Sequence, residues 1–384
     1  MNGIRPTVVV VAEAAPMRGG IATFAETITS DALLAQYFDM ELLNTARTDT
    51  REGGKLNLDN LTHAFTDAWK VLRAARRADV VHLQLVADRG LSSVRAAALI
   101  TAAALGGAKL VAHVHSAVGN AGRPEFADYG FLDRFALRSL RWADAVCTVS
   151  EAGAATMRRF AGRVPVETVD NAVDLEAFAT PADHGVPTVL FVGVICRRKG
   201  TVELARAGRA LRAKGVVDWK LVAVGGQGPT PEDEYREIVE EFRAADLAAS
   251  LVGPEYGDQV KARLAEADIF VLPSYLEGQP IAILEAMASG LPVVGTAVGA
   301  VPDVIRDGVE GRIVEPGDVS GLAAAMEQLI LDRQIRGRMA AASRKRAEEF
   351  HSLDRLARRL VQVYSNVLDG QALRSGAPGK GPGS

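Results

Sequence analysis

Two carboxylates in the segment Ser274–Gly290 have a spacing that suggests a ligand site. Glu277 and Glu285 are separated by seven residues, and Pro280 lies between them. Proline is favourable at the first position of a helix, because the N–H that it lacks would have no partner there. We therefore expect Glu277 in the loop before a helix and Glu285 in the second turn of that helix.

The predicted helix is apolar all round except for Glu285, a composition that indicates a buried helix. Glu285 shares a helical stripe with the apolar residues Ile281 and Leu284. A carboxylate on a buried helix usually has a charged partner or a function. The alternative is purely structural, with Glu277 as a helix-start charge and Glu285 paired with a buried arginine.

The start of this helix also predicts an anion site. The first N–H groups of a helix lack acceptors within it, and the helix dipole favours negative charge there. Here these groups belong to Gly278, Gln279, Ile281 and Ala282. Amides flanked by two carboxylates suit a ligand with a diphosphate in its middle and hydroxyls at both ends. A nucleotide sugar fits this description.

A basic turn, Arg197-Arg198-Lys199, follows the predicted strand Thr188–Val194. Cations at this position can neutralise a diphosphate and stabilise it as it departs. The alternative is a solvated turn without a ligand.

Two groups in the first half of the chain also lie at predicted strand ends. His115 ends the strand Lys109–Val114, where it would face a cleft, and His113 points to the same side of the strand. The turn Gly19-Gly20 would let the backbone approach a phosphate or a sugar closely. Hydrogen-bonded structural histidines and an ordinary tight turn are the alternatives. The turn is not a GxGxxG fingerprint, so a nicotinamide cofactor is not indicated.

Strand-like and helix-like segments alternate along almost the whole chain, which predicts an α/β protein with doubly wound parallel sheets. A short polar segment at Thr180–Pro187 separates two domains, residues 1–180 and 187–384. We expect the last helix to cross back onto the first domain and the tail, residues 375–384, to be disordered. Ligands of such sheets bind at the carboxyl ends of the strands, where all the groups named above lie.

Composition excludes several classes of protein. The 384 residues carry a formal net charge of −3, so nucleic acid is not expected as a partner. Two distant cysteines and no visible signal peptide predict a cytoplasmic protein. The segment Phe65–Arg77 is an amphipathic basic helix, so peripheral contact with the inner face of a membrane stays open beside an ordinary solvated surface.

In order and spacing these residues resemble the glycosyltransferases of family 4, retaining enzymes with the GT-B fold. The matching segment begins with Glu277-Gly278-Gln279-Pro280 and continues through Leu284-Glu285-Ala286-Met287-Ala288. The other matches are Gly19-Gly20, His115, Ser150-Glu151, Asn171-Ala172-Val173-Asp174 and Lys199-Gly200. The resemblance covers essentially the whole chain.

The resemblance implies a role for each match in the second half of the chain. Glu285 would accept hydrogen bonds from the donor ribose, and Glu277 would hold the transferred sugar near its anomeric carbon. The diphosphate would lie on Lys199 and on the amides that follow Glu277. The donor-binding segment implied by the resemblance consists of Gly278, Gln279, Pro280 and Ile281.

In the first half, the resemblance places His115 against the transferred sugar and Gly19-Gly20 beside the phosphate and the acceptor path. It implies no metal and no cofactor, with a UDP- or GDP-linked sugar as the donor. The acceptor would be a sugar, a lipid-linked molecule or a small molecule. We expect the segments Asp49–Asn60 and Asn120–Asp128 to form the acceptor side.

The sequence departs from the family pattern after Gly193, where Val194 replaces the usual arginine. Arg197 or Arg198 would then supply the missing guanidinium. Two other functions stay open at this point: a nucleotide-sugar epimerase on the same architecture, and a non-catalytic protein that binds nucleotide sugars.

Overall fold

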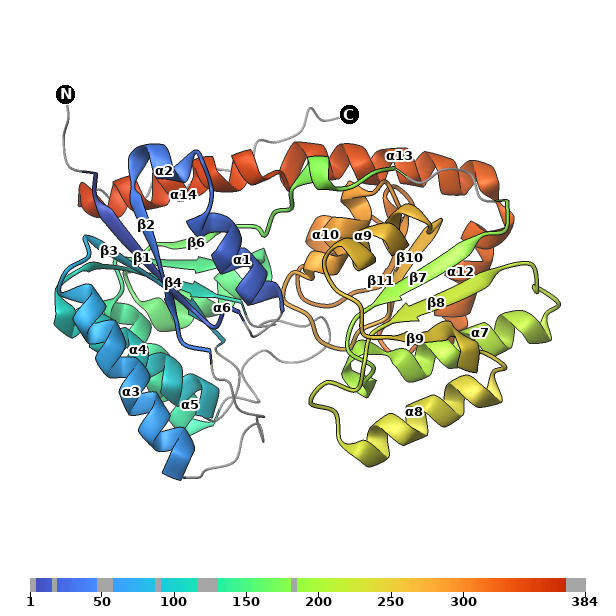
Figure 1. Ribbon diagram of the computed structural model, residues 1–384, viewed down its shortest axis with the longest axis horizontal. Coiled ribbons are helices and arrows are strands. Elements are labelled where there is room, and N and C mark those ends of the chain that lie inside the picture. Colours follow the sequence, from blue (N-terminus) through green and yellow to red (C-terminus); the bar gives the residue numbers. More distant parts are fainter. Residues whose placement is uncertain are drawn as a thin grey trace.

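The computed structural model describes residues 5–15, 19–46, 58–86, 91–115, 130–180 and 185–370. Within these residues the chain forms two parallel β-sheets flanked by helices (Figure 1). The predicted loop Asn120–Asp128, most of the predicted loop Asp49–Asn60 and the predicted tail 375–384 lie outside the described residues.

The first sheet has the strand order β2-β1-β3-β4-β5-β6, with parallel pairing throughout. Its strands are apolar runs because helices cover both faces of the sheet. In β1, for example, Val8 to Val11 are at most 2% exposed. The strands are β1 (Thr7–Ala12), β2 (Asp39–Asn44), β3 (Val80–Leu85), β4 (Lys109–Val114), β5 (Ala145–Thr148) and β6 (Val166–Thr168).

Two layers of helices enclose this sheet, and each has its own apolar core. One layer contains α3 (Leu58–Ala75), α4 (Leu91–Gly106), α5 (Phe131–Leu137), the 3-10 helix η1 (Arg138–Trp142) and α6 (Glu151–Ala161). The other contains α1 (Gly20–Thr29), α2 (Leu34–Tyr37) and α14 (Leu353–Leu368).

The second sheet has the strand order β12-β11-β10-β7-β8-β9 and one continuous apolar core. Its strands are β7 (Thr188–Val192), β8 (Lys220–Val224), β9 (Leu251–Gly253), β10 (Ile269–Leu272), β11 (Val293–Thr296) and β12 (Gly311–Val314). The helices of this half are α7 (Thr201–Ala213), α8 (Glu232–Ala244), α9 (Asp258–Ala265), α10 (Ile281–Ala288), α11 (Val301–Val304), α12 (Val319–Leu331) and α13 (Arg333–Phe350). The predicted pair of doubly wound parallel sheets is therefore confirmed.

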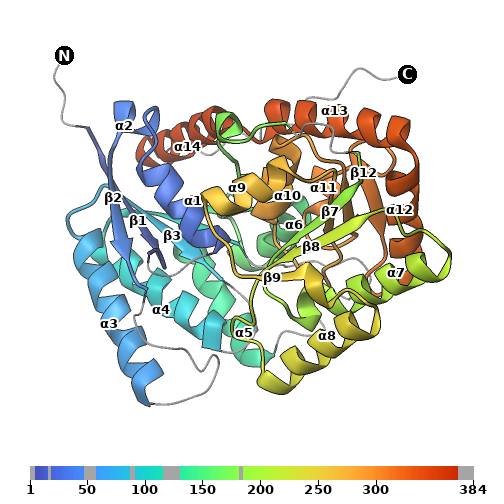
Figure 2. The same ribbon diagram turned by 45° about the vertical axis from the view of Figure 1, so that its right-hand side comes forward.

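The last two helices connect the halves of the molecule. Helices α13 and α14 run along one side of both sheets, as Figures 1 and 2 show. Helix α14 follows the complete second sheet in the chain, yet its apolar side lies in the core of the first. The buried hydroxyl of Tyr364 is 2.7 Å from Nδ1 of His82 on β3, a polar link between α14 and the first sheet.

Removing the Tyr364 hydroxyl is expected to weaken this attachment. In Tyr364→Phe, the buried Nδ1 of His82 loses its hydrogen-bond partner, at a cost of about 1–3 kcal/mol in the free energy of unfolding. Urea unfolding followed by circular dichroism measures this change. The matched control is Tyr37→Phe, because Tyr37 is 50% exposed and its change should stay within about 0.5 kcal/mol. Equal unfolding of Tyr364→Phe and the wild type would contradict the link.

Two local predictions are wrong. The helix expected over Ile21–Leu34 stops at Thr29, because the Ser30 hydroxyl donates to the carbonyl of Glu26 and competes with the backbone. Pro280, expected as the first helical residue, has extended backbone with φ −72° and ψ 116° and precedes α10. The side chains of Ile281 and Glu285 on α10 are half-buried, so this helix is not enclosed all round.

Candidate active site

The carboxyl ends of β4 and β10 meet between the two sheets. Gly278 follows β10, and a Cβ atom on it would lie 2.4 Å from the carbonyl oxygen of His115, which follows β4. Gly20, at the start of α1, lies across from α10, since its Cβ position is 3.5 Å from Cδ1 of Ile281. Figures 1 and 2 both place α1 on the side of the first sheet that faces α10. The structure therefore brings His115, Gly20 and the start of α10 together.

Glu277 is held in the loop between β10 and α10. Its side chain is 8% exposed, and Oε1 accepts hydrogen bonds from Lys199 Nζ at 2.6 Å and from Ser274 Oγ at 2.7 Å. Both donors reach the same oxygen, and no donor to Oε2 is present among the described residues. A buried carboxylate with one fixed and one available oxygen is suited to accept a hydrogen bond from a ligand hydroxyl.

The backbone around Glu277 is fixed by the loop after β11. The amide of Ala300 donates to the carbonyl of Gly278 at 2.7 Å. Gly299 has φ +54°, and a Cβ on it would lie 2.1 Å from the Glu277 carbonyl oxygen. In the described part of the chain, the amides of Gly278, Gln279, Ile281 and Ala282 have no acceptor, whereas those of Ile283 and Leu284 donate to the Pro280 carbonyl. The four available donors are those at which the sequence predicts an anion site.

Glu285 lies one turn into α10 and is half-buried. No arginine or other hydrogen-bonding partner of its carboxylate is found among the described residues, so the structural pair considered above is absent from them. Burial raises the pKa of Glu285 to about 7, and the charge of Lys261 opposes the shift. Ionising this half-buried carboxyl without a partner costs free energy. Glu285 is therefore a candidate for ligand binding.

His115 is a neutral imidazole at physiological pH, because burial lowers its pKa to about 3. Its Nε2–H donates to Gln84 Oε1 at 2.6 Å, which leaves Nδ1 as an acceptor. The ring stacks on His113 with the centroids 4.2 Å apart, and His113 is fully buried below it. Of the two histidines, only His115 is at the carboxyl edge of the sheet.

The three cations of the basic turn have separate partners. Lys199 binds Glu277, and Arg198 donates to the carbonyl of Leu276 at 3.1 Å, beside the same loop. Arg197 instead pairs with Glu237 on α8. Arg198 is therefore the arginine next to the site, and Arg197 is not.

Gln279 has an arrangement that the sequence did not indicate. Its side chain is 5% exposed and Oε1 accepts from the backbone N–H of Asn171, while Nε2 donates to Asp170 at 2.9 Å. The Nδ2 of Asn171 donates back to the Gln279 carbonyl at 2.8 Å. The Gln279 side chain thus connects the site loop to the segment between the sheets, and only its backbone faces the anion site.

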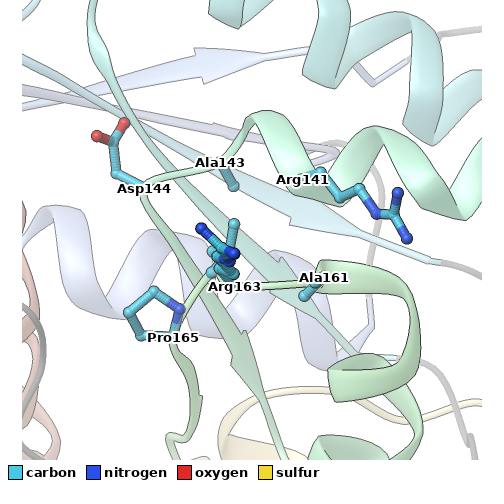
Figure 3. A pocket seen from close by; sticks show the side chains of 8 residues that line it. Arg141, Ala143, Asp144, Ala161, Arg163 and Pro165 are labelled. Atoms are coloured by element: carbon cyan, nitrogen blue, oxygen red, sulfur yellow. The ribbon is translucent and has the colours of Figure 1, made fainter.

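Other polar features of the described residues do not form this site. A shallow pocket lined by Arg141, Asp144 and Pro165 lies at the amino ends of β5 and β6, away from the carboxyl edge (Figure 3). Gly225 and Gly228 pack against Gly193 and Val194, so the glycine-rich end of β8 serves close packing. Among the described residues no cluster of three or more His, Cys, Asp or Glu suited to a metal is present.

The contact between Gly278 and His115 predicts a strong effect of a small substitution. In Gly278→Ala, the new methyl group would overlap the His115 carbonyl, so the loop or the neighbouring strand end must shift. We expect at least a tenfold weaker affinity for the ligand of this site, measured by calorimetric titration. The matched control is Gly337→Ala in α13, where the Cβ position is open and alanine favours the helix. Unchanged affinity in Gly278→Ala would contradict the close contact.

Comparison with known proteins finds two matching families. Residues 18–177 match the family described as Glycosyltransferase Family 4, and residues 186–332 match the family described as Glycosyl transferases group 1. The first match includes most of the first sheet, and the second includes the whole of the second sheet.

Named relatives are similar over part of their length. The chain is 31% identical over 242 residues to D-inositol 3-phosphate glycosyltransferase of Salinispora arenicola, covering 58% of this chain and 54% of that protein. It is 32% identical over 255 residues to alpha-maltose-1-phosphate synthase of Mycobacterium tuberculosis, covering 59% of this chain and 64% of that protein. The chain thus spans between half and two thirds of the length of these two relatives.

Solved structures confirm the predicted GT-B fold. Sucrose-phosphate synthase from Thermosynechococcus elongatus superposes with a TM-score of 0.78 at 19% identity, covering 96% of this chain and all of that chain. The Anabaena protein HepE, in complex with UDP and glucose, has a TM-score of 0.71 at 18% identity and covers 94% of this chain.

Proposed function

We propose that this protein is a glycosyltransferase that transfers a sugar from a nucleoside-diphosphate sugar to an acceptor hydroxyl, with retention of the anomeric configuration. The observation that carries the proposal is the cluster of Lys199, Ser274 and Glu277 beside the open amides of the α10 start. On one side of it lies Glu285, whose carboxylate has no partner among the residues that the structure describes, and on the other lies His115 from the first sheet. Diphosphate, ribose and sugar each find a complementary group in this arrangement.

In the proposed complex the diphosphate lies on the N–H groups of Gly278, Gln279, Ile281 and Ala282, where the helix dipole also stabilises its charge. Glu285 accepts hydrogen bonds from the ribose hydroxyls. Glu277 uses its available Oε2 for the hydroxyls of the transferred sugar. The Lys199–Glu277 pair positions this carboxylate and provides a cation for the departing diphosphate.

The reaction exchanges one bond for another at the anomeric carbon. The bond from this carbon to the diphosphate oxygen breaks, and a bond to the acceptor oxygen forms on the same face. The acceptor proton passes to an oxygen of the departing diphosphate. His115, neutral and with Nδ1 as an acceptor, orients a sugar hydroxyl rather than supplying a proton.

Arg198 is the residue that we propose in place of the arginine missing at Val194. It is held at the carbonyl of Leu276, directly before Glu277, whereas Arg197 is paired with α8. Gly19-Gly20 provides the side-chain-free approach to the phosphate and the acceptor path. Any other residue would strain the backbone at Gly19, because residues with a side chain rarely adopt its φ of +154°.

The base of the donor is tested by a thermal-shift panel. The panel contains UDP, GDP, ADP and NAD, followed by the sugars of each nucleoside diphosphate that binds. A ligand at a hundredfold excess over its Kd stabilises the folded protein by about 2.7 kcal/mol. We expect stabilisation by UDP or GDP and a larger effect of the matching sugar, in line with the UDP-bound structure of the Anabaena neighbour. Stabilisation by NAD alone, or by no compound, would contradict the proposal.

A further inference from the structure

The segment α5–η1 (Phe131–Trp142) exposes large apolar side chains that the core does not use. Phe131, Leu132, Phe135 and Trp142 are 79%, 67%, 66% and 57% exposed. They recur at helical spacing, which gathers them on one side of the segment. A cluster of this kind marks an interaction surface, in contrast to single exposed apolar residues.

The opposite side of the same segment is already packed. Leu137 and Leu140 are at most 2% exposed and belong to the core between the first sheet and α4. The segment is thus apolar on two sides, one against the protein and one toward solvent. A helix of this composition requires a second apolar environment for its outer side.

The exposed phenylalanine and tryptophan side chains of the described residues lie in this helical layer. In the described part of the chain, every exposed phenylalanine or tryptophan lies on α5–η1 or on α3, where Phe65 and Trp69 are 77% and 50% exposed. Figures 1 and 2 both place α3 and α5 on the side of the molecule away from α13 and α14. The exposed phenylalanine and tryptophan side chains of the described residues are therefore gathered on one side of the molecule.

The charge on α5–η1 is positive. Arg134, Arg138 and Arg141 are exposed between the apolar residues. Asp133, the one carboxylate of this segment, is buried and accepts from the N–H of Gly130. The outer side of α5–η1 therefore combines aromatic rings with arginines, while the one carboxylate of the segment is buried.

We propose that α5–η1 docks this protein on the surface of an anionic lipid bilayer. Rings buried at the headgroup level and arginines beside anionic headgroups are the two contributions that hold an interfacial helix. A second copy of the chain fits this surface less well, because a symmetric contact would bring the same arginines together. The proposal concerns adsorption to lipid and does not depend on the sugar-transfer reaction.

Co-sedimentation with vesicles tests the proposal. Phosphatidylcholine vesicles are compared with vesicles that contain a third phosphatidylglycerol, without nucleotide or acceptor present. We expect the full chain to bind the anionic vesicles and to be released by high salt. The variant Phe131→Ser/Leu132→Ser/Phe135→Ser should lose at least tenfold in partition coefficient. Arg138→Glu should lose about fivefold or more, since each cation near the surface contributes about this factor.

Matched controls lie outside this surface. Leu331→Ser replaces a leucine that is 65% exposed at the end of α12, and Arg338→Glu reverses an exposed charge on α13. Both should bind vesicles as the wild type does, and thermal midpoints confirm that all variants are folded. Absence of wild-type binding, equal binding to neutral vesicles, or full binding by the triple variant would overturn the proposal. Binding lost only in Phe65→Ser/Trp69→Ser would assign the contact to α3 and overturn it as well.

Discussion

Replacing Lys199 with alanine is expected to lower kcat by about 10²- to 10³-fold, the usual cost of losing one group that stabilises developing charge. The substitution removes the proposed cation at the diphosphate and also leaves Glu277 without its ion-pair partner. Because both side chains are largely buried, we expect a loss of about 3 kcal/mol in the free energy of unfolding too. Steady-state kinetics well below the thermal midpoint separates the two effects.

The matched control for Lys199→Ala is another lysine–glutamate pair of the same length. Lys214 Nζ lies 2.6 Å from Glu327, but the lysine side chain is 53% exposed. Lys214→Ala should therefore change kcat by less than twofold and stability by less than about 1 kcal/mol. If Lys199→Ala kept wild-type kcat, Lys199 would not stabilise the departing diphosphate.

Glu285→Gln is expected to weaken nucleoside-diphosphate binding about 10- to 100-fold, because hydrogen bonds to a charged acceptor contribute about 1.5–3 kcal/mol. The variant keeps the shape of the side chain and removes its charge. Calorimetric titration of UDP and GDP at pH 8, where the carboxyl is ionised, measures the change in Kd. Glu315→Gln, an exposed position in the same half of the chain, is the control that should bind normally.

The same substitution should change the pH dependence of stability. Burial raises the pKa of Glu285 from 4.5 to about 7, so the folded protein holds this proton more tightly than the unfolded chain does. The contribution of Glu285 to the free energy of unfolding is therefore complete below pH 4.5, falls between pH 4.5 and 7, and stays low above pH 7. In Glu285→Gln the fall between pH 4.5 and 8 should be about 2–3 kcal/mol smaller than in the wild type.

Urea unfolding at several pH values checks this expectation. A variant that follows the wild-type curve at every pH would mean that the pKa of Glu285 is not raised. Together, the two measurements separate binding from stability, because the variant should bind more weakly while it loses less stability at high pH. Residues that bind ligands often destabilise the empty protein in this way.

Much of the fold could be predicted from the sequence because its signals are local. The apolar run Val8–Ala12 reads as a strand covered on both faces, and the structure has it so. The segment from Ser274 to Pro280 forms a loop before a helix, since proline fixes φ there and glycine permits a turn. Where side-chain competition decided the outcome, as at Ser30, helical periodicity alone gave the wrong helix end.

The partners of the site residues could not be predicted, because they are far apart in the chain. Lys199 and Glu277 are 78 positions apart, and Gln279 and Asn171 are 108 positions apart. No spacing rule distinguishes Arg197, which turns to α8, from Arg198, which stays beside the loop. No residue next to Gln279 in the sequence indicates that its side chain points away from the anion site.

The central claim is that the site around Glu277, Glu285 and Lys199 transfers a sugar from a nucleotide donor. Proton NMR of the protein incubated with the nucleotide sugar that stabilises it, without acceptor, tests this claim most directly. We predict slow release of nucleoside diphosphate and of free sugar that first appears in the anomeric configuration of the donor, and release slower by about a hundredfold or more in Lys199→Ala. Conversion of the donor to an epimer, or no turnover of a donor that binds, would contradict it.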